Sequence, residues 1–431
     1  MYSAAINPIR RWLIFAGMLL AAGSFAFSAA WHARAAHWAA SPDPETRLRA
    51  ATSEPANADL WYQLGRYWQL DFEHSDLPLA ISYYQRATSL NPGSASYWMD
   101  LAGAYETAGN ISQAEQAFRK AREVYPISAE AAWRLGNFLL RQGRTPEAFQ
   151  HIHDAVVTDP KFTALAVSRS WQSARDIDRI LTTVLPDQAD ENWGAIQFFV
   201  QAREPVPAMA VWERIAAHRA SFPVSQAFPL VDMLVETRHA DDARIVWTQA
   251  LLAAGIQEGT VPNGALVWNG GFERDFLNGG FDWRVGAIEG AEMGWDEQIV
   301  HSGRRSLRVD FDGSANVDFQ NIWQYVLVQP ATRYRFSSFF RTQDLSTDSG
   351  MRFEIRDISH PGNPSRFTPN ALGAQPWVEE VVEFTTGSDT KLLQVVLRRT
   401  RSEKLGNKIR GTAWIDDVAL APLPSSPGAP R

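Results

Sequence analysis

Three segments of the chain repeat one order of small and large apolar positions. Each segment ends in a proline, at Pro92, Pro126 and Pro160, with a constant spacing of 34 residues. Small residues at helical spacing allow two antiparallel helices to approach closely, so the pattern predicts stacked helical hairpins. The positions in register before the three prolines are Ala80, Tyr84 and Ala87, then Ala114, Phe118 and Ala121, then Ala148, Ile152 and Ala155.

This period and these positions resemble the tetratricopeptide repeat. The resemblance implies three repeats over 58–160, with an insertion around Phe72 to Asp76, and less regular helical hairpins over 161–256. In arrays of this family, the first helix of each hairpin lines a groove that binds a protein or peptide segment. A solenoid that serves only as a rigid spacer is the alternative. The groove positions carried onto this sequence are Tyr62, Arg66, Met99, Trp133 and Asn137.

After Gly255 the apolar pattern changes from helical spacing to alternation. Short alternating segments separated by turn residues predict an antiparallel β-sandwich over 266–421, entered through a linker at 257–265 and followed by a disordered tail at 422–431. The clearest alternating segments are 333–340, 352–358, 378–386 and 392–400. The expected fold is therefore multidomain α plus β, with a tetratricopeptide-type α-solenoid before a C-terminal antiparallel β-sandwich of jelly-roll type.

Four short motifs in this region resemble carbohydrate-binding modules of the family 4/9/22 type, which are galactose-binding-like jelly rolls. They are NGGFE (269–273), GFDW (280–283), SGRRSLRV (302–309) and WIDDVAL (414–420). The resemblance implies glycan binding and a structural calcium held by Glu273 and Asp417, whose oxygens suit that ion. The alternative is that one carboxylate caps a turn and no metal binds. The family pattern also places three tryptophans in the core: Trp283, Trp377 and Trp414.

Sugar recognition needs flat aromatic side chains and a few polar groups. The aromatic candidates are Trp295, Trp323 and Tyr325, and the polar candidates are Glu354, Gln394 and Arg398. Strand alternation puts Glu354 with its polar neighbours on one face, and Gln394 with Arg398 on one face. A solvated convex face is the alternative. The basic run at 398–410 favours an anionic glycan or another acidic surface, or is only a solvated hairpin.

The N-terminus carries a long apolar run behind Arg10 and Arg11. Residues 12–31 contain no charge and are long enough to cross a membrane. They predict either a transmembrane anchor or a cleaved signal, with residues 1–11 cytoplasmic. Residues 32–57 are expected to be a linker. The rest is then extracytoplasmic, on an inner-membrane-anchored protein of the cell envelope, or secreted if the signal is removed.

Charge and motif content narrow the function classes. The net charge of −7 disfavours nucleic acid as a partner, and the absence of cysteine excludes disulfides and thiol chemistry. No GxSxG, HExxH, Walker or dinucleotide-binding glycine motif occurs. We therefore expect a non-catalytic exported scaffold that binds a protein partner through its repeats and polysaccharide through its sandwich, in cell-envelope or exopolysaccharide assembly. A pure protein–protein adaptor and a divergent glycoside-processing enzyme are the two alternatives.

Overall fold

The computed structural model describes residues 8–71, 75–256 and 266–424. Parts of four predicted segments lie outside these ranges: the basic N-terminus, the insertion at 72–74, the linker at 257–265 and the tail from 425. The chain forms two compact units, Met1–Asp187 and Gln188–Arg431, which are described in turn.

The first unit opens with a long apolar helix. Helix α1 spans Pro8–Ala39, and its stretch Ile9–Ala39 is long and apolar enough to cross a membrane. Helix α2 (Pro44–Ser53) follows, with Asp43 accepting a hydrogen bond from the Thr46 N–H at its start.

The predicted linker at 32–57 is wrong, because most of it is helical and packed. Ala35 and Ala39 of α1 and Ala50 and Ala51 of α2 are buried in one cluster with Leu60 and Leu64. Ala35 and Ala39 lie one helical turn apart, so they give α1 an apolar side that packs in the same cluster as the two alanines of α2.

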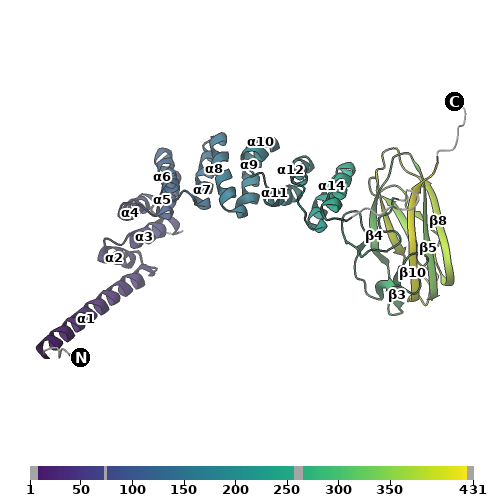
Figure 1. The fold of residues 1–431 in the computed structure, drawn as a ribbon, viewed down its shortest axis with the longest axis horizontal. Coiled ribbons are helices and arrows are strands. Elements are labelled where there is room, and N and C mark those ends of the chain that lie inside the picture. Colours follow the sequence, from purple (N-terminus) through teal and green to yellow (C-terminus); the bar gives the residue numbers. More distant parts are fainter. Residues whose placement is uncertain (1–7, 72–74, 257–265, 425–431) are drawn as a thin grey trace, which may run out of the picture. The chain divides into compact units, whose positions relative to one another are not determined.

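Three antiparallel helix pairs form the repeat array of the first unit (Figure 1). Its predicted alanines are at most 1% exposed. Gly136 also permits close approach, since an added Cβ would lie 2.7 Å from the Ile152 side chain. The pairs are α3 (Ala58–Leu70) with α4 (Leu77–Leu90), α5 (Ala95–Thr107) with α6 (Ile111–Val124), and α7 (Ala129–Arg141) with α8 (Thr145–Thr158).

Further helices follow the array, as predicted for 161–256. In the first unit these are η1 (Pro160–Phe162), α9 (Thr163–Ala174) and α10 (Ile177–Thr183). In the second unit they are α11 (Ala189–Ala202), α12 (Pro205–Ala217), η2 (Val224–Ala227), α13 (Phe228–Glu236) and α14 (Ala240–Ala253).

The second unit ends in an antiparallel β-sandwich of two five-stranded sheets (Figure 1). Sheet A has the order β1-β4-β9-β6-β7: β1 (Arg284–Val285), β4 (Phe319–Leu327), β9 (Leu392–Arg399), β6 (Arg352–Asp357) and β7 (Arg366–Phe367). Sheet B has the order β2-β3-β10-β5-β8: β2 (Ala291–Asp296), β3 (Ser306–Asp312), β10 (Arg410–Pro422), β5 (Arg333–Leu345) and β8 (Gly373–Thr385). One apolar core lies between them.

The glycine-rich stretch before β1 seats the last helical hairpin on the sandwich. An added Cβ at Gly279 would lie 2.1 Å from the Phe228 ring of α13, and one at Gly280 would lie 2.3 Å from the Trp247 ring of α14. Gly280 also has a positive φ of 57°. The close approach of these two aromatic rings therefore explains why positions 279 and 280 are both glycine.

Candidate functional site

The outer face of sheet A carries a row of side chains that crosses all five strands. Backbone pairing places Arg284, Trp323, Val396, Glu354 and Phe367 opposite one another, in strand order β1, β4, β9, β6 and β7. Cross-strand partners point to the same face of a sheet. On β4, β9 and β6 the neighbouring residues Ile322, Val395, Leu397, Phe353 and Ile355 belong to the core, so the row faces away from it.

The aromatic end of this row lies against the last helical hairpin. The Trp323 and Tyr325 rings are 4.8 Å apart at their centroids, nearly perpendicular, and both are half-buried. The Arg284 guanidinium lies 4.8 Å from the Trp323 centroid and 5.5 Å from that of Tyr325. Both its terminal nitrogens donate to Asp232 of α13, with Nη1 3.0 Å from Oδ2. A carboxylate of the helical hairpin therefore holds the cation that covers both aromatic rings.

Polar groups fill the middle of the row. Glu354 is 8% exposed, and its carboxylate accepts hydrogen bonds from Arg356 Nη2 at 2.7 Å and Ser365 Oγ at 2.8 Å. Arg398 Nε lies 3.6 Å from Glu354, while its Nη1 binds Asp318. Burial opposes ionisation of Glu354, but these donors outweigh it and lower its pKa. Gln394 is the Cα partner of Tyr325 on the same face.

Five of the six candidate sugar-binding residues thus share one face, and Trp295 does not. Trp295 pairs with Leu307 of the core and packs against that core from β2. Its ring lies 4.5 Å from the Phe276 ring, and the Arg305 guanidinium covers it at 4.3 Å. The structure therefore does not support Trp295 as a sugar-binding platform, because its ring packs on the core and Arg305 covers it.

Two of the tryptophans expected in the core lie elsewhere. Trp283 is in the core as predicted. Trp414 is 4% exposed but lies on the outer face of sheet B, where its indole N–H donates to Asp296 at 2.8 Å. Trp377 is half-buried near the His301 ring, at 5.7 Å. Flanking polar side chains, rather than the core, bury Trp414.

The basic run at 398–410 does not form one charged surface. Arg398 and Arg399 end strand β9, and Arg399 is fully buried inside the sandwich. Lys404 pairs with Asp348 at 3.1 Å, and Arg401 is exposed. The basic residues of this run therefore lie in three places: on the outer face of sheet A, inside the sandwich, and in a solvated loop.

The two candidate calcium ligands both lie beside Gly271, but each is held by hydrogen-bond donors. Glu273 accepts from the Arg304 N–H at 2.7 Å and from Arg304 Nε at 3.2 Å. Asp417 accepts from His301 Nδ1 at 2.6 Å and Ser302 Oγ at 2.8 Å. Donors stand where a calcium ion needs further oxygens, so these residues as arranged do not fit the ion. Calcium binding stays a prediction.

The candidate groove residues of the repeats differ in their surroundings. Tyr62 stacks on Tyr97 at 4.4 Å and donates to Asp100 at 2.6 Å, and burial raises its pKa. Arg66 is exposed, with its guanidinium 5.9 Å from the Tyr62 centroid.

The other three groove candidates lie on α5 and α7. Trp133 is half-buried 5.4 Å from the Phe162 ring, and Asn137 donates to the Trp133 carbonyl at 2.8 Å. Met99 is 8% exposed and packs with Ala121 and Ala131, so its assignment to an open groove is wrong. Met99 fills the space between helices instead of facing solvent.

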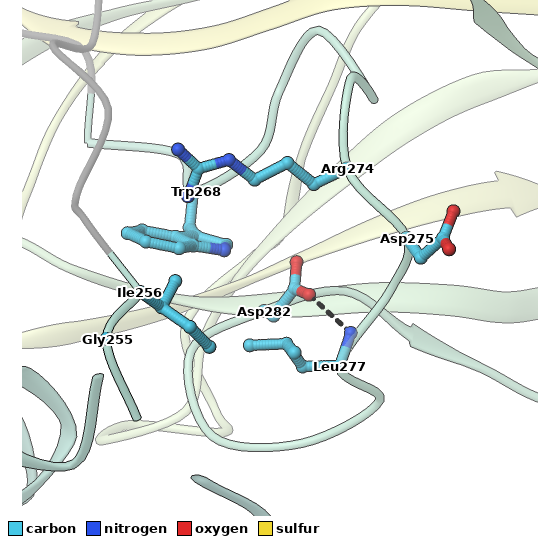
Figure 2. Close-up of a pocket in the computed structure, with 7 residues that line it drawn as sticks. All are labelled: Gly255, Ile256, Trp268, Arg274, Asp275, Leu277 and Asp282. Atoms are coloured by element: carbon cyan, nitrogen blue, oxygen red, sulfur yellow. Dashed lines mark hydrogen bonds between the residues drawn. The ribbon is translucent and has the colours of Figure 1, made fainter. Parts of the chain in front are cut away.

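Two cavities were not predicted from the sequence. One of about 470 Å³ lies beside the end of α14, and Figure 2 shows the Arg274 side chain extending toward the Trp268 indole above the buried Asp282. Asp282 accepts from the Leu277 N–H at 2.6 Å. The other, of about 620 Å³, lies in the repeats between α4 and α6, over Trp98, Leu101 and Tyr105 of α5. The spacing of apolar residues in the sequence does not predict cavities between elements.

Comparison with known proteins identifies the repeats. Two overlapping segments, 69–123 and 104–161, match the family model of the tetratricopeptide repeat. Small glutamine-rich tetratricopeptide repeat-containing protein 2 of Mycosarcoma maydis is 33% identical over 85 residues, which are 20% of this chain and 24% of that protein.

Solved structures resemble each half of the chain. MamA is 13% identical, with a TM-score of 0.25, over 49% of this chain and 86% of that one. The CBM22-1 xylan-binding domain of Xyn10C from Paenibacillus barcinonensis is 14% identical, with a TM-score of 0.27, over 36% of this chain and 93% of that one. A structure titled "CBM4 structure and function" is 16% identical, with a TM-score of 0.27, over 36% of this chain and 99% of that one. At TM-scores this low, these likenesses say nothing of what this chain binds. Tetratricopeptide repeats are shown for residues 69–161.

Proposed function

We propose that this protein is a non-catalytic scaffold whose sandwich binds a saccharide on the outer face of sheet A. The observation that carries the proposal is the part of the cross-strand row that runs from Trp323 on β4 to Phe367 on β7. Three strand spacings separate these two side chains, or roughly 14 Å. That span suits an oligosaccharide rather than a single sugar ring.

The chemistry of the face supports a sugar as the ligand. Aromatic rings offer flat apolar surfaces for pyranose rings, and Phe367 is 40% exposed. Gln394 and the Glu354–Arg398 group supply donors and acceptors for hydroxyls. Because its hydrogen bonds lower the pKa of Glu354, this carboxylate is suited to accept hydrogen bonds and poorly suited to act as a general acid.

The remaining parts of the proposal concern the first unit. The repeats bind a protein partner, supported by the tetratricopeptide match and by Tyr62, Arg66 and Trp133 on first helices. Helix α1 anchors the chain at a membrane, supported by its length and apolar composition. The setting proposed for both is polysaccharide assembly at the cell envelope.

The test is saccharide binding by the full chain in detergent, measured by affinity electrophoresis in gels containing single polysaccharides. We expect Phe367→Ala and Trp323→Ala each to weaken binding roughly two- to tenfold, since one aromatic contact to a ring is worth about 0.5–1.5 kcal/mol. Trp377→Ala is the control, because Trp377 is a half-buried tryptophan on the other sheet.

Two outcomes contradict the proposal. If no polysaccharide retards the wild-type chain, the sandwich is structural and the protein is an adaptor. If Trp377→Ala weakens binding as much as Phe367→Ala does, the saccharide binds elsewhere.

A further inference from the structure

Four arginine residues of sheet A lie on its outer face, in the same alternation as the row: Arg284, Arg352, Arg356 and Arg398. Arginine carries its charge at all physiological pH values, so each guanidinium needs a counter-charge or solvent. Three of them have a carboxylate partner: Arg284 with Asp232, Arg356 with Glu354, and Arg398 with Asp318.

Arg352 differs from the other three. It opens strand β6, with Arg398 as its Cα partner on β9, and its guanidinium lies 4.2 Å from the centroid of the Phe367 ring. Among the residues that the structure describes, it forms no ion pair, and its buried Nε has no hydrogen-bond partner. Burial, with the nearby positive charge of Arg398, lowers the pKa of Arg352 and outweighs the attraction of Glu354.

A half-buried cation without a partner is costly unless a ligand supplies the charge. The ring of Phe367 holds the guanidinium plane by a cation–π contact and leaves its edge for a planar or tetrahedral anion. The location is the Phe367 end of the row that we propose binds saccharide. The opposite end, at Trp323, already has its cation neutralised by Asp232.

We propose that the saccharide bound on sheet A is acidic, and that Arg352 binds its carboxylate or sulfate group. This inference rests on the proposed function, and it adds the ligand class and the residue that selects it. Arg352 and Phe367 form the acidic-sugar end of the site, and Trp323 with Tyr325 forms the neutral, stacking end.

The experiment compares acidic polymers with their neutral counterparts, using the full chain in detergent. Polygalacturonate and its carboxyl-reduced form test for a carboxylate, while dextran sulfate and dextran test for a sulfate. We expect wild-type protein to bind one acidic polymer at least tenfold more tightly than its neutral counterpart. Arg352→Gln removes that preference, so that the acidic polymer binds no more tightly than its neutral counterpart, and Arg352→Lys keeps part of the preference.

The matched control is Arg401→Gln, which removes the same charge from an exposed position of the sandwich. Thermal unfolding of each variant shows that the sandwich is intact. If Arg401→Gln weakens binding of the acidic polymer as much as Arg352→Gln does, the attraction is general and the inference is overturned.

The two proposals fail in different ways. Equal binding of acidic and neutral polymers, with Arg352→Gln unchanged, overturns the acidic ligand and leaves saccharide binding standing. Absence of binding to every polymer overturns both.

Discussion

Arg399 shows how a single charged residue holds the loops of the sandwich. It is fully buried, and its guanidinium donates to the carbonyl of Ser349 at 3.0 Å, to Thr347 Oγ1 at 3.2 Å and to Asn316 Oδ1 at 3.2 Å. These acceptors come from two separate loops. Neutral oxygen acceptors therefore satisfy the buried guanidinium of Arg399. Of the two adjacent arginines, only Arg398 lies on the outer face of sheet A.

Asp282 makes stability depend on pH. Burial raises its pKa from an ordinary 3.8 to about 6, although N–H donors from Leu277 and Trp283 oppose the shift. A carboxyl with a raised folded-state pKa contributes its full stability below the unfolded value and loses it as pH rises through the folded value. The free energy of unfolding should therefore lose a contribution from this group between about pH 4 and pH 6.

We expect Asp282→Asn to remove that loss. Relative to wild type, the variant should gain stability from pH 4 to pH 7, by roughly 3 kcal/mol at most, since each pKa unit is worth about 1.4 kcal/mol. Urea unfolding followed by tryptophan fluorescence at intervals over this range measures the difference. A difference that stays constant with pH would show that burial does not perturb this carboxyl.

At this scale the sequence predicted which residues share a strand face. Glu354 shares a face with Arg352 and Arg356 on β6, and Gln394 shares one with Arg398 on β9, so period-two alternation was sufficient within each strand. The pairing of these two strands is seen only in the structure. Alternation could not distinguish the inner face from the outer one. Alternation also could not identify Arg352 as a cation without an ion-pair partner. That property depends on which side chains the fold brings near Arg352 from distant parts of the sequence.

At the scale of elements, the junction between the last hairpin and the sandwich rests on close packing. Gly280→Ala should destabilise the second unit by roughly 2–4 kcal/mol, because the Cβ would meet Trp247 at 2.3 Å and the backbone has a positive φ. Thermal and urea unfolding measure this change.

Gly294→Ala is the control for this substitution. Within the described part of the chain, an added Cβ at Gly294 would meet no atom within 4 Å, so its effect should stay below about 1 kcal/mol. Equal effects of the two substitutions would mean that contact with Trp247 does not explain the glycine.

Long elements were predictable and short or unusual ones were not. The helices of the repeats follow a strong period, and β5, β6, β8 and β9 follow clear alternation. The two-residue strands β1 and β7 are too short for any period, yet β7 carries Phe367. Helix α2 was missed because its proline and charged residues resemble a linker, while its buried alanines are identified only by their contacts.

At the scale of the whole molecule, the last helices group with the sandwich. The second unit begins at Gln188, well before the change in periodicity at Gly255. Asp232 of α13 binds Arg284, and Asp241 of α14 binds Lys391 at 2.7 Å. A fragment that starts after residue 256 would lose both contacts, so a study of the sandwich should retain these helices.

The central claim is that saccharide binds to sheet A, and hydrogen–deuterium exchange of the full chain with and without the bound polymer tests it most directly. Backbone amides within β4, β9, β6 and the β7 segment should become protected, while those of β3 and β10 in sheet B stay unchanged. Protection confined to sheet B, or to the helical repeats, would contradict the account.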